Sequence, residues 1–331
     1  MPPRGPLIDA VIALTGQHDR DSFEASLVLT LWDCTSPSRI ALQRLCGDPE
    51  APSMCCALAR EGELVTGSLV SRSRQRTSRV ADVPAMAAAW SRREVVRLPR
   101  PRGSHEIHPV RVGQRVFALL EIESARRLTR TQSRQIEALL TLASNYLALI
   151  NESERDVLTE LHNRRTFDRY FSRMQSDGAT KQWLGVIDID HFKQVNDRFG
   201  HLYGDEVLIL VARLMQASFR YTDMLYRFGG EEFVVLLECD DGTSAGCAFD
   251  RFSRSVANKD FPQVGRVTVS IGYTEISPGE VAAAAIARAD EALYWAKGNG
   301  RNRVAWHEAL VREGALHQQR EDATAGEVEM F

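Results

Sequence analysis

The sequence predicts a mixed α/β (α+β) protein with two domains joined by a long helix. The chain has 331 residues, a length typical of roughly two domains of ordinary size. Its hydrophobic content of 44% is sufficient for a core in each domain. From about residue 155 onward, short apolar runs typical of strands alternate with segments of helical periodicity, and residues 1–150 differ from them in character.

The first half of the chain gives the less distinct patterns. Asp21 to Trp32 is compatible with a helix or a strand, and residues 66–105 are rich in Ser, Arg and Pro with little apolar periodicity. Val116 to Ile122 predicts a strand, and a long helix is expected from about Thr131 to Glu154. A domain that closes with a strand and an outgoing helix resembles a GAF-like sensor, which we expect over residues 1–130. A PAS-like domain is the alternative.

One face of the expected helix can be written as a heptad seam. The heptad positions are Ile136, Ala143, Ile150 and Val157, and the residues Leu139 and Tyr146 lie between them. Such a seam pairs two chains in a parallel coiled coil. The alternative is that the stripe packs on its own N-terminal domain. We expect residues 131–154 to form a helical, coiled-coil linker.

The second half predicts one α+β domain over residues 155–310. Helices are expected at about 163–175, 191–198, 203–219, 243–257 and 280–297. Strands are expected at about 182–190 and 266–273, with a strand hairpin over 224–238. Residues 311–331 are polar with little periodicity, which is typical of a flexible tail.

Two acidic clusters stand beside strand-like runs. Asp188 follows one apolar run directly, and Glu231 and Glu232 lie between two others. Gly229 and Gly230 predict a tight hairpin turn, because successive glycines tolerate positive φ. Carboxylates brought together in this way repel one another unless a cation is bound, so the pattern fits a metal–triphosphate site.

Taken alone, the Gly-Gly-Glu-Glu string is weak evidence, because glycine turns flanked by acids occur on many surfaces. Here it is one of several motifs in order, found at residues 156–165, 188–205, 229–233, 268–272 and 289–303. Together they resemble the GGDEF family, in its GGEEF variant, over about residues 152–308. These diguanylate cyclases condense two GTP molecules into cyclic di-GMP. The resemblance implies a palm-like nucleotidyl-cyclase fold.

The resemblance also implies the metal ligands and a base. Asp188, the main-chain carbonyl of Ile189 and Glu231 match the positions that bind Mg²⁺ or Mn²⁺, both of which suit hard oxygen ligands. Glu232 is the candidate base toward the ribose 3′-hydroxyl, although which acid activates the hydroxyl stays open. Asp190 is expected to cap the helix that begins at His191.

The implied substrate-binding residues are Phe192, Lys193, Asn196, Asp205, Leu208, Lys297 and Arg301. A helix N-terminus favours phosphate, and Lys193, the second expected catalytic residue beside Glu232, adds a positive charge there. Lys297 and Arg301 resemble γ-phosphate ligands, and a lysine in the last turn of a helix also has a structural explanation.

Asn196 and Asp205 match the positions that read guanine. A carboxylate accepts from the two donors on the guanine edge, and adenine lacks this pair, so ATP would leave Asp205 unpaired. Leu208, one turn further along, is expected to line the base pocket.

Arg220 and Asp223 match the family's Arg-x-x-Asp site, at which cyclic di-GMP inhibits the enzyme, and Arg251 is a further candidate there. The alternative is a chance surface pair. Glu160 departs from the glycine usual at its position, which puts the geometry of that turn in doubt.

The implied reaction needs two domains. One domain holds one GTP and the product joins two, so we expect a homodimer in which two sites face each other. An unknown small-molecule or protein signal is expected to act on the N-terminal domain. A receptor that only binds nucleotide is the competing class, and a phosphodiesterase is disfavoured because no second domain of the required size is present.

Composition excludes other classes. With 41 basic and 44 acidic residues the net charge is −3, which indicates neither a nucleic-acid nor a membrane surface. No window approaches the roughly 18 apolar residues of a membrane span, and the N-terminus is a poor signal peptide, so we expect a cytoplasmic protein. The six cysteines match neither a zinc site nor a disulfide framework, and reduced thiols are expected.

Overall fold

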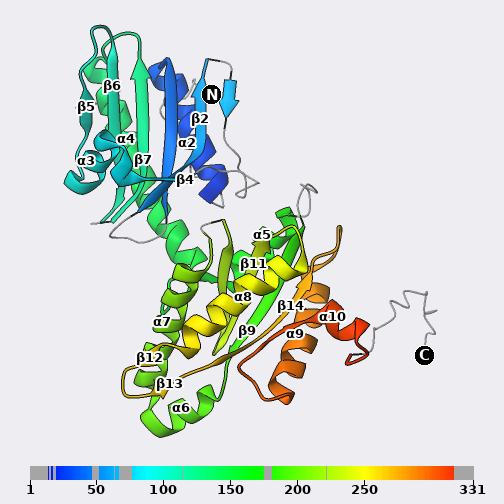
Figure 1. Ribbon diagram of the computed structural model, residues 1–331. Coiled ribbons are helices and arrows are strands. Elements are labelled where there is room, and N and C mark those ends of the chain that lie inside the picture. The colour runs from blue at the N-terminus through cyan, green and yellow to red at the C-terminus, as the bar shows by residue number, and fades with distance from the viewer. Residues whose placement is uncertain are drawn as a thin grey trace, which may run out of the picture. The chain divides into compact units, whose positions relative to one another are not determined.

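The described residues of the computed structural model contain two large β-sheets with helices on their faces (Figure 1). It describes residues 14, 16–17, 20–46, 52–62, 64–66, 77–113, 115–174, 181–220 and 222–316. The chain divides into two compact units, one of residues 1–177 with 211–227 and one of residues 178–210 with 228–331. No helix within the described ranges is long and apolar enough to cross a bilayer.

The N-terminal sheet is antiparallel throughout. Its strand order is β3-β2-β1-β7-β6-β5, with β4 beside β2. The strands are β1 Arg39–Cys46, β2 Ser53–Glu61, β3 Leu64–Thr66, β4 Thr77–Arg79, β5 Val96–Leu98, β6 Ser104–Val112 and β7 Arg115–Ser124. The strand predicted at 116–122 is therefore confirmed, and it pairs with β1 on one side and β6 on the other.

Helices cover both faces of this sheet. On one face, α2 (Arg20–Thr35) and α4 (Arg130–Glu154) form a core with Leu120. On the other, α3 (Pro84–Arg92) and the short helix η1 (Val80–Asp82) pack on Leu119. Neighbouring strand residues point to opposite faces, which is why Leu119 and Leu120 belong to different clusters.

The ambiguous segment from Asp21 to Trp32 is helical. Phe23, Leu27 and Leu31 recur every four residues along α2 and are fully buried. This spacing places all three on one side of a helix, facing the sheet. The segment is nevertheless apolar on other sides as well, which is why its period does not stand out in the sequence.

The predicted coiled-coil seam on α4 is wrong. Ile136 and Ala143 are 0% exposed because they complete the core of their own domain, and the ring of Tyr146 stacks on Phe23 at 4.9 Å. Val157 lies beyond the helix and is 95% exposed. The alternative, that the stripe packs on its own N-terminal domain, is therefore what the structure shows. The helix itself begins with a capping box between Thr129 and Gln132.

The second sheet has the strand order β15-β14-β9-β11-β10-β8. The strands are β8 His162–Asn163, β9 Gln182–Ile189, β10 Met224–Gly229, β11 Glu232–Glu238, β14 Val269–Glu275 and β15 Val304–Trp306, and a separate ribbon joins β12 Asp260–Phe261 to β13 Gly265–Arg266. The helices are α5 Arg164–Met174, α6 Phe192–Phe199, α7 His201–Ser218, α8 Gly242–Ala257, α9 Ala282–Gly298 and α10 His307–Arg312.

Every helix and strand predicted in this half is present. The short elements β15 and α10 were not predicted, because three and six residues give no readable period. The helix α10 also reaches into the start of the expected tail. The remainder of that tail, residues 317–331, lies outside the described residues.

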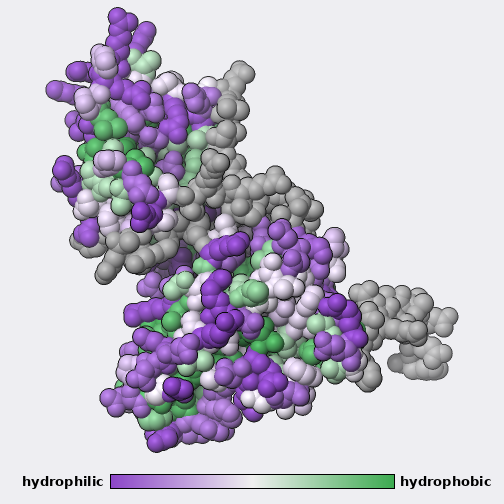
Figure 2. Space-filling view, viewed as in Figure 1, coloured by the Kyte–Doolittle hydropathy of each residue, from purple (hydrophilic) through white to green (hydrophobic). Residues whose placement is uncertain are grey.

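Two glycines let helices pack closely on opposite faces of this sheet. A Cβ on Gly272 of β14 would overlap the carbonyl oxygen of Ala289 in α9, whereas a Cβ on Gly185 of β9 would overlap the ring of Phe249 in α8. The close approach of α9 matters for function, because this helix carries Lys297 to the end of β9. In the view of Figure 2 the described surface is mainly hydrophilic, with apolar side chains in small separate patches.

Candidate active site

The acidic residues gather where β9 ends and its antiparallel neighbours β11 and β14 begin. Glu232 and Ser270 are the cross-strand partners of Asp188. Cross-strand partners project from the same face of a sheet, so Asp188 and Glu232 point to the side covered by α9. Glu231 lies in the turn before β11, where Gly229 and Gly230 have φ of 146° and 51°, so the predicted glycine turn is confirmed.

Lys297 compensates part of this negative charge. Its Nζ lies 2.8 Å from Asp188 Oδ2, and the Asp188 side chain is almost completely buried. Burial raises the pKa of Asp188 and the charge of Asp190 adds to this, while the hydrogen bond from Lys297 opposes it. The lysine therefore stands where a cation is needed, at the end of its helix.

The acids outnumber this lysine. Burial raises the pKa of Glu231, and the charges of Asp188 and Glu232 raise it further. Asp290 on α9, which we did not predict, belongs to the same group, because burial and the charge of Glu232 raise its pKa. Its signal in the sequence is its position seven residues before Lys297, on the same side of the helix. Repelling, half-buried oxygen donors of this kind fit a hard divalent cation.

The phosphate-binding residues predicted from the sequence surround the same corner. His191 precedes α6 with φ of 58°, and no side chain caps that helix start. The start of α6 therefore has no side-chain cap and lies beside the exposed Lys193, an arrangement that suits a phosphate. Phe192 is buried and anchors the helix. Arg301 follows α9, and its charge lowers the pKa of Asp188, which indicates that it lies close by.

Asp190 does not cap α6, contrary to expectation. Its two carboxylate oxygens accept from Ser270 Oγ (2.6 Å), Thr268 Oγ1 (2.6 Å) and the backbone N–H of Asn302 (3.0 Å). The physical reason is that His191 takes a left-handed backbone conformation, and that these three donors hold the Asp190 carboxylate on the side of β14.

The predicted guanine-reading residues lie around the junction of α6 and α7. A Cβ on Gly204 would overlap Asn196 Oδ1, so the glycine lets the Asn196 amide rest against the start of α7. The next residue, Asp205, is exposed, and Leu208 one turn later is buried. The structure thus brings Asn196 and the exposed Asp205 to the same junction.

Arg220 and Asp223 form one turn. The backbone N–H of Arg220 donates to Asp223 Oδ2 (2.7 Å), and the backbone N–H of Asp223 donates to the Arg220 carbonyl (3.0 Å). The Arg220 side chain is exposed, as is Arg251 on α8. The two residues of the Arg-x-x-Asp motif are therefore neighbours in space as well as in sequence.

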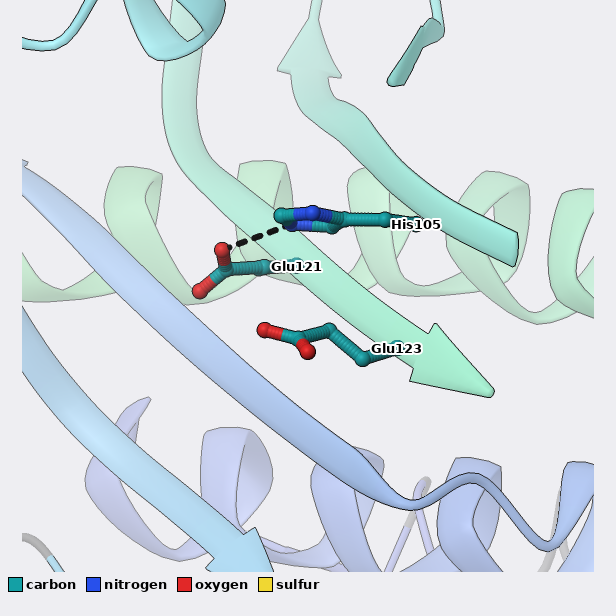
Figure 3. A group of neighbouring side chains, drawn as sticks. All are labelled: His105, Glu121 and Glu123. Carbon is teal, nitrogen blue, oxygen red and sulfur yellow. Dashed lines mark hydrogen bonds and ion pairs between the residues drawn. The ribbon is translucent and has the colours of Figure 1, made fainter. Parts of the chain in front are cut away.

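A second group of possible metal ligands lies on the N-terminal sheet and was not predicted. Within the described residues, His105, Glu121 and Glu123 are close enough to share an ion (Figure 3). Glu121 accepts from Arg39 (2.6 Å) and lies 2.9 Å from His105 Nε2, and Glu123 accepts from Arg100 (2.7 Å). Because guanidinium groups already bind both carboxylates, this group is a compensated ion network and does not favour a cation.

Comparison with known proteins matches the second half of the chain. Residues 153–303 match the family model of the diguanylate cyclase, GGDEF domain. The chain is 34% identical over 213 residues to "Diguanylate cyclase A" of Treponema denticola, covering 59% of this chain and 57% of that protein. It is 40% identical over 156 residues to "Diguanylate cyclase DgcP" of Pseudomonas aeruginosa, covering 45% and 23%. The chain thus spans about half or less of the length of these relatives.

Solved structures of the same kind are also similar. The coiled coil and GGDEF domain of DgcB from Caulobacter crescentus, in complex with c-di-GMP, has 29% identity and a TM-score of 0.48, covering 54% of this chain and 100% of that chain. The active GGEEF domain of a diguanylate cyclase from Vibrio cholerae has 34% identity and a TM-score of 0.41, covering 44% and 96%.

Proposed function

Because residues 153–303 belong to the GGDEF family, we propose that this protein is a diguanylate cyclase that converts two GTP molecules into cyclic di-GMP and two pyrophosphates. The observation that carries the proposal is the placement of Asp188 and Glu232 as cross-strand partners, with Glu231 in the adjoining turn and Lys297 beside Asp188. This arrangement concentrates acids and a lysine where neighbouring central strands meet at one end of the sheet, as phosphoryl chemistry on a metal-bound triphosphate requires.

Asp188, the Ile189 carbonyl and Glu231 would hold Mg²⁺, or Mn²⁺ in its place. The raised pKa values of Asp188 and Glu231 support this assignment, because Asp188 is buried, Glu231 is half-buried, and their charges are only partly compensated. When bound, the ion neutralises charge on the triphosphate.

The remaining residues of the chain bind and orient the substrate. Lys297 and Arg301 bind the γ-phosphate, and the start of α6 with Lys193 binds the other phosphates, which places the α-phosphorus for attack. Glu232 accepts the proton of the ribose 3′-hydroxyl.

The nucleobase of the substrate is selected at the junction of α6 and α7. Asp205 accepts from the N1–H and exocyclic amino group of guanine, Asn196 contacts the same edge, and Leu208 packs on the base. Adenine would leave Asp205 without its two donors, and such a loss rejects the wrong substrate strongly.

The reaction takes place between two copies of the domain. Each holds one GTP, and each 3′-oxygen attacks the α-phosphorus held by the other copy. The heptad face of α4 packs in the core of its own domain, so we propose that the homodimer forms through another surface. We assign the N-terminal domain, with its antiparallel sheet and flanking helices, to a GAF-like sensor whose signal controls that pairing. Product inhibition acts through Arg220 and Asp223, with Arg251 as a further contact.

Incubation of the full chain with GTP and Mg²⁺, followed by chromatography and mass spectrometry, tests the proposal. Cyclic di-GMP should form from GTP and no cyclic dinucleotide from ATP, and Glu232→Gln should form cyclic di-GMP at least about 100-fold more slowly. If the parent binds GTP tightly yet forms no cyclic di-GMP at any protein concentration, the protein is a nucleotide receptor and the proposal fails.

A further inference from the structure

Asp190 is a buried acid that no step of the proposed reaction uses. It is 5% exposed and lies directly after β9, two residues beyond Asp188. A buried carboxylate is costly unless donors satisfy it. Here Ser270 and Thr268 donate from the start of β14, and Asn302 donates from the loop after α9. Asp190 therefore joins three separate segments of the chain.

The loop that it holds has an unfavourable backbone conformation. Gly300, Arg301 and Asn302 all have positive φ, of 106°, 60° and 45°. Residues with a Cβ seldom adopt this conformation unless surrounding contacts impose it. The backbone N–H of Arg301 donates to the Ala296 carbonyl (3.0 Å), and that of Asn302 donates to Asp190 Oδ2. Without the second bond, the loop has less to hold it in the conformation that directs Arg301.

We propose that Asp190 is a positioning residue for the γ-phosphate: it fastens the loop of Arg301 to the strand end that carries Asp188. The inference rests on the proposed function, since it deepens the role of Arg301. We assign Asp190 to holding the loop and not to the metal or the substrate, because Oδ1 accepts from Ser270 and Oδ2 accepts from both Thr268 and the loop at Asn302. Its own backbone N–H also donates to the Thr268 carbonyl (2.9 Å), so the residue is held on two sides.

Asp190→Asn is the informative variant. An amide keeps the size of the side chain, but its N–H₂ group cannot accept a hydrogen bond. In the Oδ2 position it would lose the bond from the Asn302 N–H, and in either orientation it removes the negative charge that strengthens all three bonds. We expect the affinity for a non-hydrolysable GTP analogue to fall by at least about tenfold, as for loss of a charge-assisted hydrogen bond. The affinity for GDP, which lacks the γ-phosphate, should fall much less.

Calorimetric titration of the full chain with both nucleotides measures this ratio. Asp241→Asn is the matched control. Asp241 caps α8 by accepting from the Ser244 N–H (2.7 Å), and it is not one of the proposed metal-binding or substrate-binding residues. The variant should change the melting temperature little, because asparagine caps a helix about as well as aspartate, and it should leave the GTP-to-GDP affinity ratio at the parental value. The milder variants Ser270→Ala and Thr268→Val decide the matter if Asp190→Asn does not fold, and each should lower the ratio in the same direction.

A parental affinity ratio in Asp190→Asn, or in both milder variants, overturns the inference. This outcome is separate from failure of the proposed function, which is read from cyclic di-GMP formation by the parent. A parent that binds GTP but forms no product still shows, through the same titrations, whether Asp190 positions the γ-phosphate contact. A parent that does not bind GTP overturns both.

Discussion

Lys297 Nζ lies 2.8 Å from Asp188 Oδ2, so the lysine proposed to bind the γ-phosphate also forms an ion pair with a proposed metal ligand. In the absence of substrate this pair keeps a buried carboxylate compensated. A metal ion held by Asp188 would take over this compensation and would leave Lys297 available to contact phosphate. The charge on the acids therefore affects whether Lys297 is available to bind the substrate.

Glu231→Gln should stabilise the metal-free protein at neutral pH. Burial and the charges of Asp188 and Glu232 raise the pKa of Glu231 in the folded state, so its ionised form destabilises the fold. That cost is present above the raised pKa and disappears as the pH falls below the usual carboxyl value of about 4.3. Urea unfolding in EDTA should show a stabilised variant at pH 7 and no difference at low pH. With excess Mg²⁺ the order should reverse, and equal stability at pH 7 in EDTA would contradict the charge argument.

Glu232→Gln should lower turnover by about 100-fold or more, because the amide cannot accept the proton of the 3′-hydroxyl. GTP binding should stay close to that of the parent. The matched control is Glu238→Gln at the opposite end of β11, which should keep full activity. Initial rates and titration with GTP distinguish the outcomes. Loss of binding together with turnover would make Glu232 a ligand and leave the base unassigned.

Arg220→Ala should remove product inhibition and keep the initial rate. Arg220 is the better choice than Asp223, because the Asp223 carboxylate also accepts from the Arg220 backbone and its loss would disturb the turn. Rates measured at increasing cyclic di-GMP should fall for the parent and stay level for the variant. Equal sensitivity of the two proteins would show that the motif is an incidental surface pair.

Ile136→Lys should unfold the N-terminal domain, because it places a charge in a core position that is 0% exposed. We expect a loss of about 4 kcal/mol or more. Leu149→Lys is the control on the opposite side of the same helix, where the residue is 62% exposed, and it should be nearly neutral. Thermal unfolding and sedimentation follow both variants. An Ile136→Lys protein that is fully folded and merely less dimeric would restore the coiled-coil hypothesis.

The sequence predicts features that depend on residues close together in the chain, and it does not predict features that depend on residues far apart. The hairpin at Gly229 and Gly230 was predictable, because its turn chemistry and flanking strands are adjacent in the chain. The bonds of Asp190 were not, since their donors lie 78 to 112 residues away. The stripe on α4 shows a third case. Its pattern identifies a buried face but does not say whether the partner is the same domain or another chain.

Glu160 gives the last test, and it concerns a departure from the family pattern. The residue has φ of 57°, yet the turn forms, with the Glu160 N–H donating to the Asp156 carbonyl (2.9 Å) and Asp156 Oδ1 accepting from Thr159. A side chain in this left-handed conformation is strained, and glycine is not. Glu160→Gly should therefore stabilise the protein by roughly 0.5–1 kcal/mol after the larger chain entropy of glycine is included.

Glu160→Ala provides the comparison that isolates backbone strain, because it removes the same carboxylate but keeps a Cβ at the left-handed position. The melting temperature should rise for the glycine variant and not for the alanine variant. If both variants shift equally, the carboxylate and not the backbone is the source of the effect. If neither shifts, the turn between Asp156 and Leu161, closed by the Asp156 N–H donating to the Leu161 carbonyl (2.8 Å), accommodates the side chain without measurable strain.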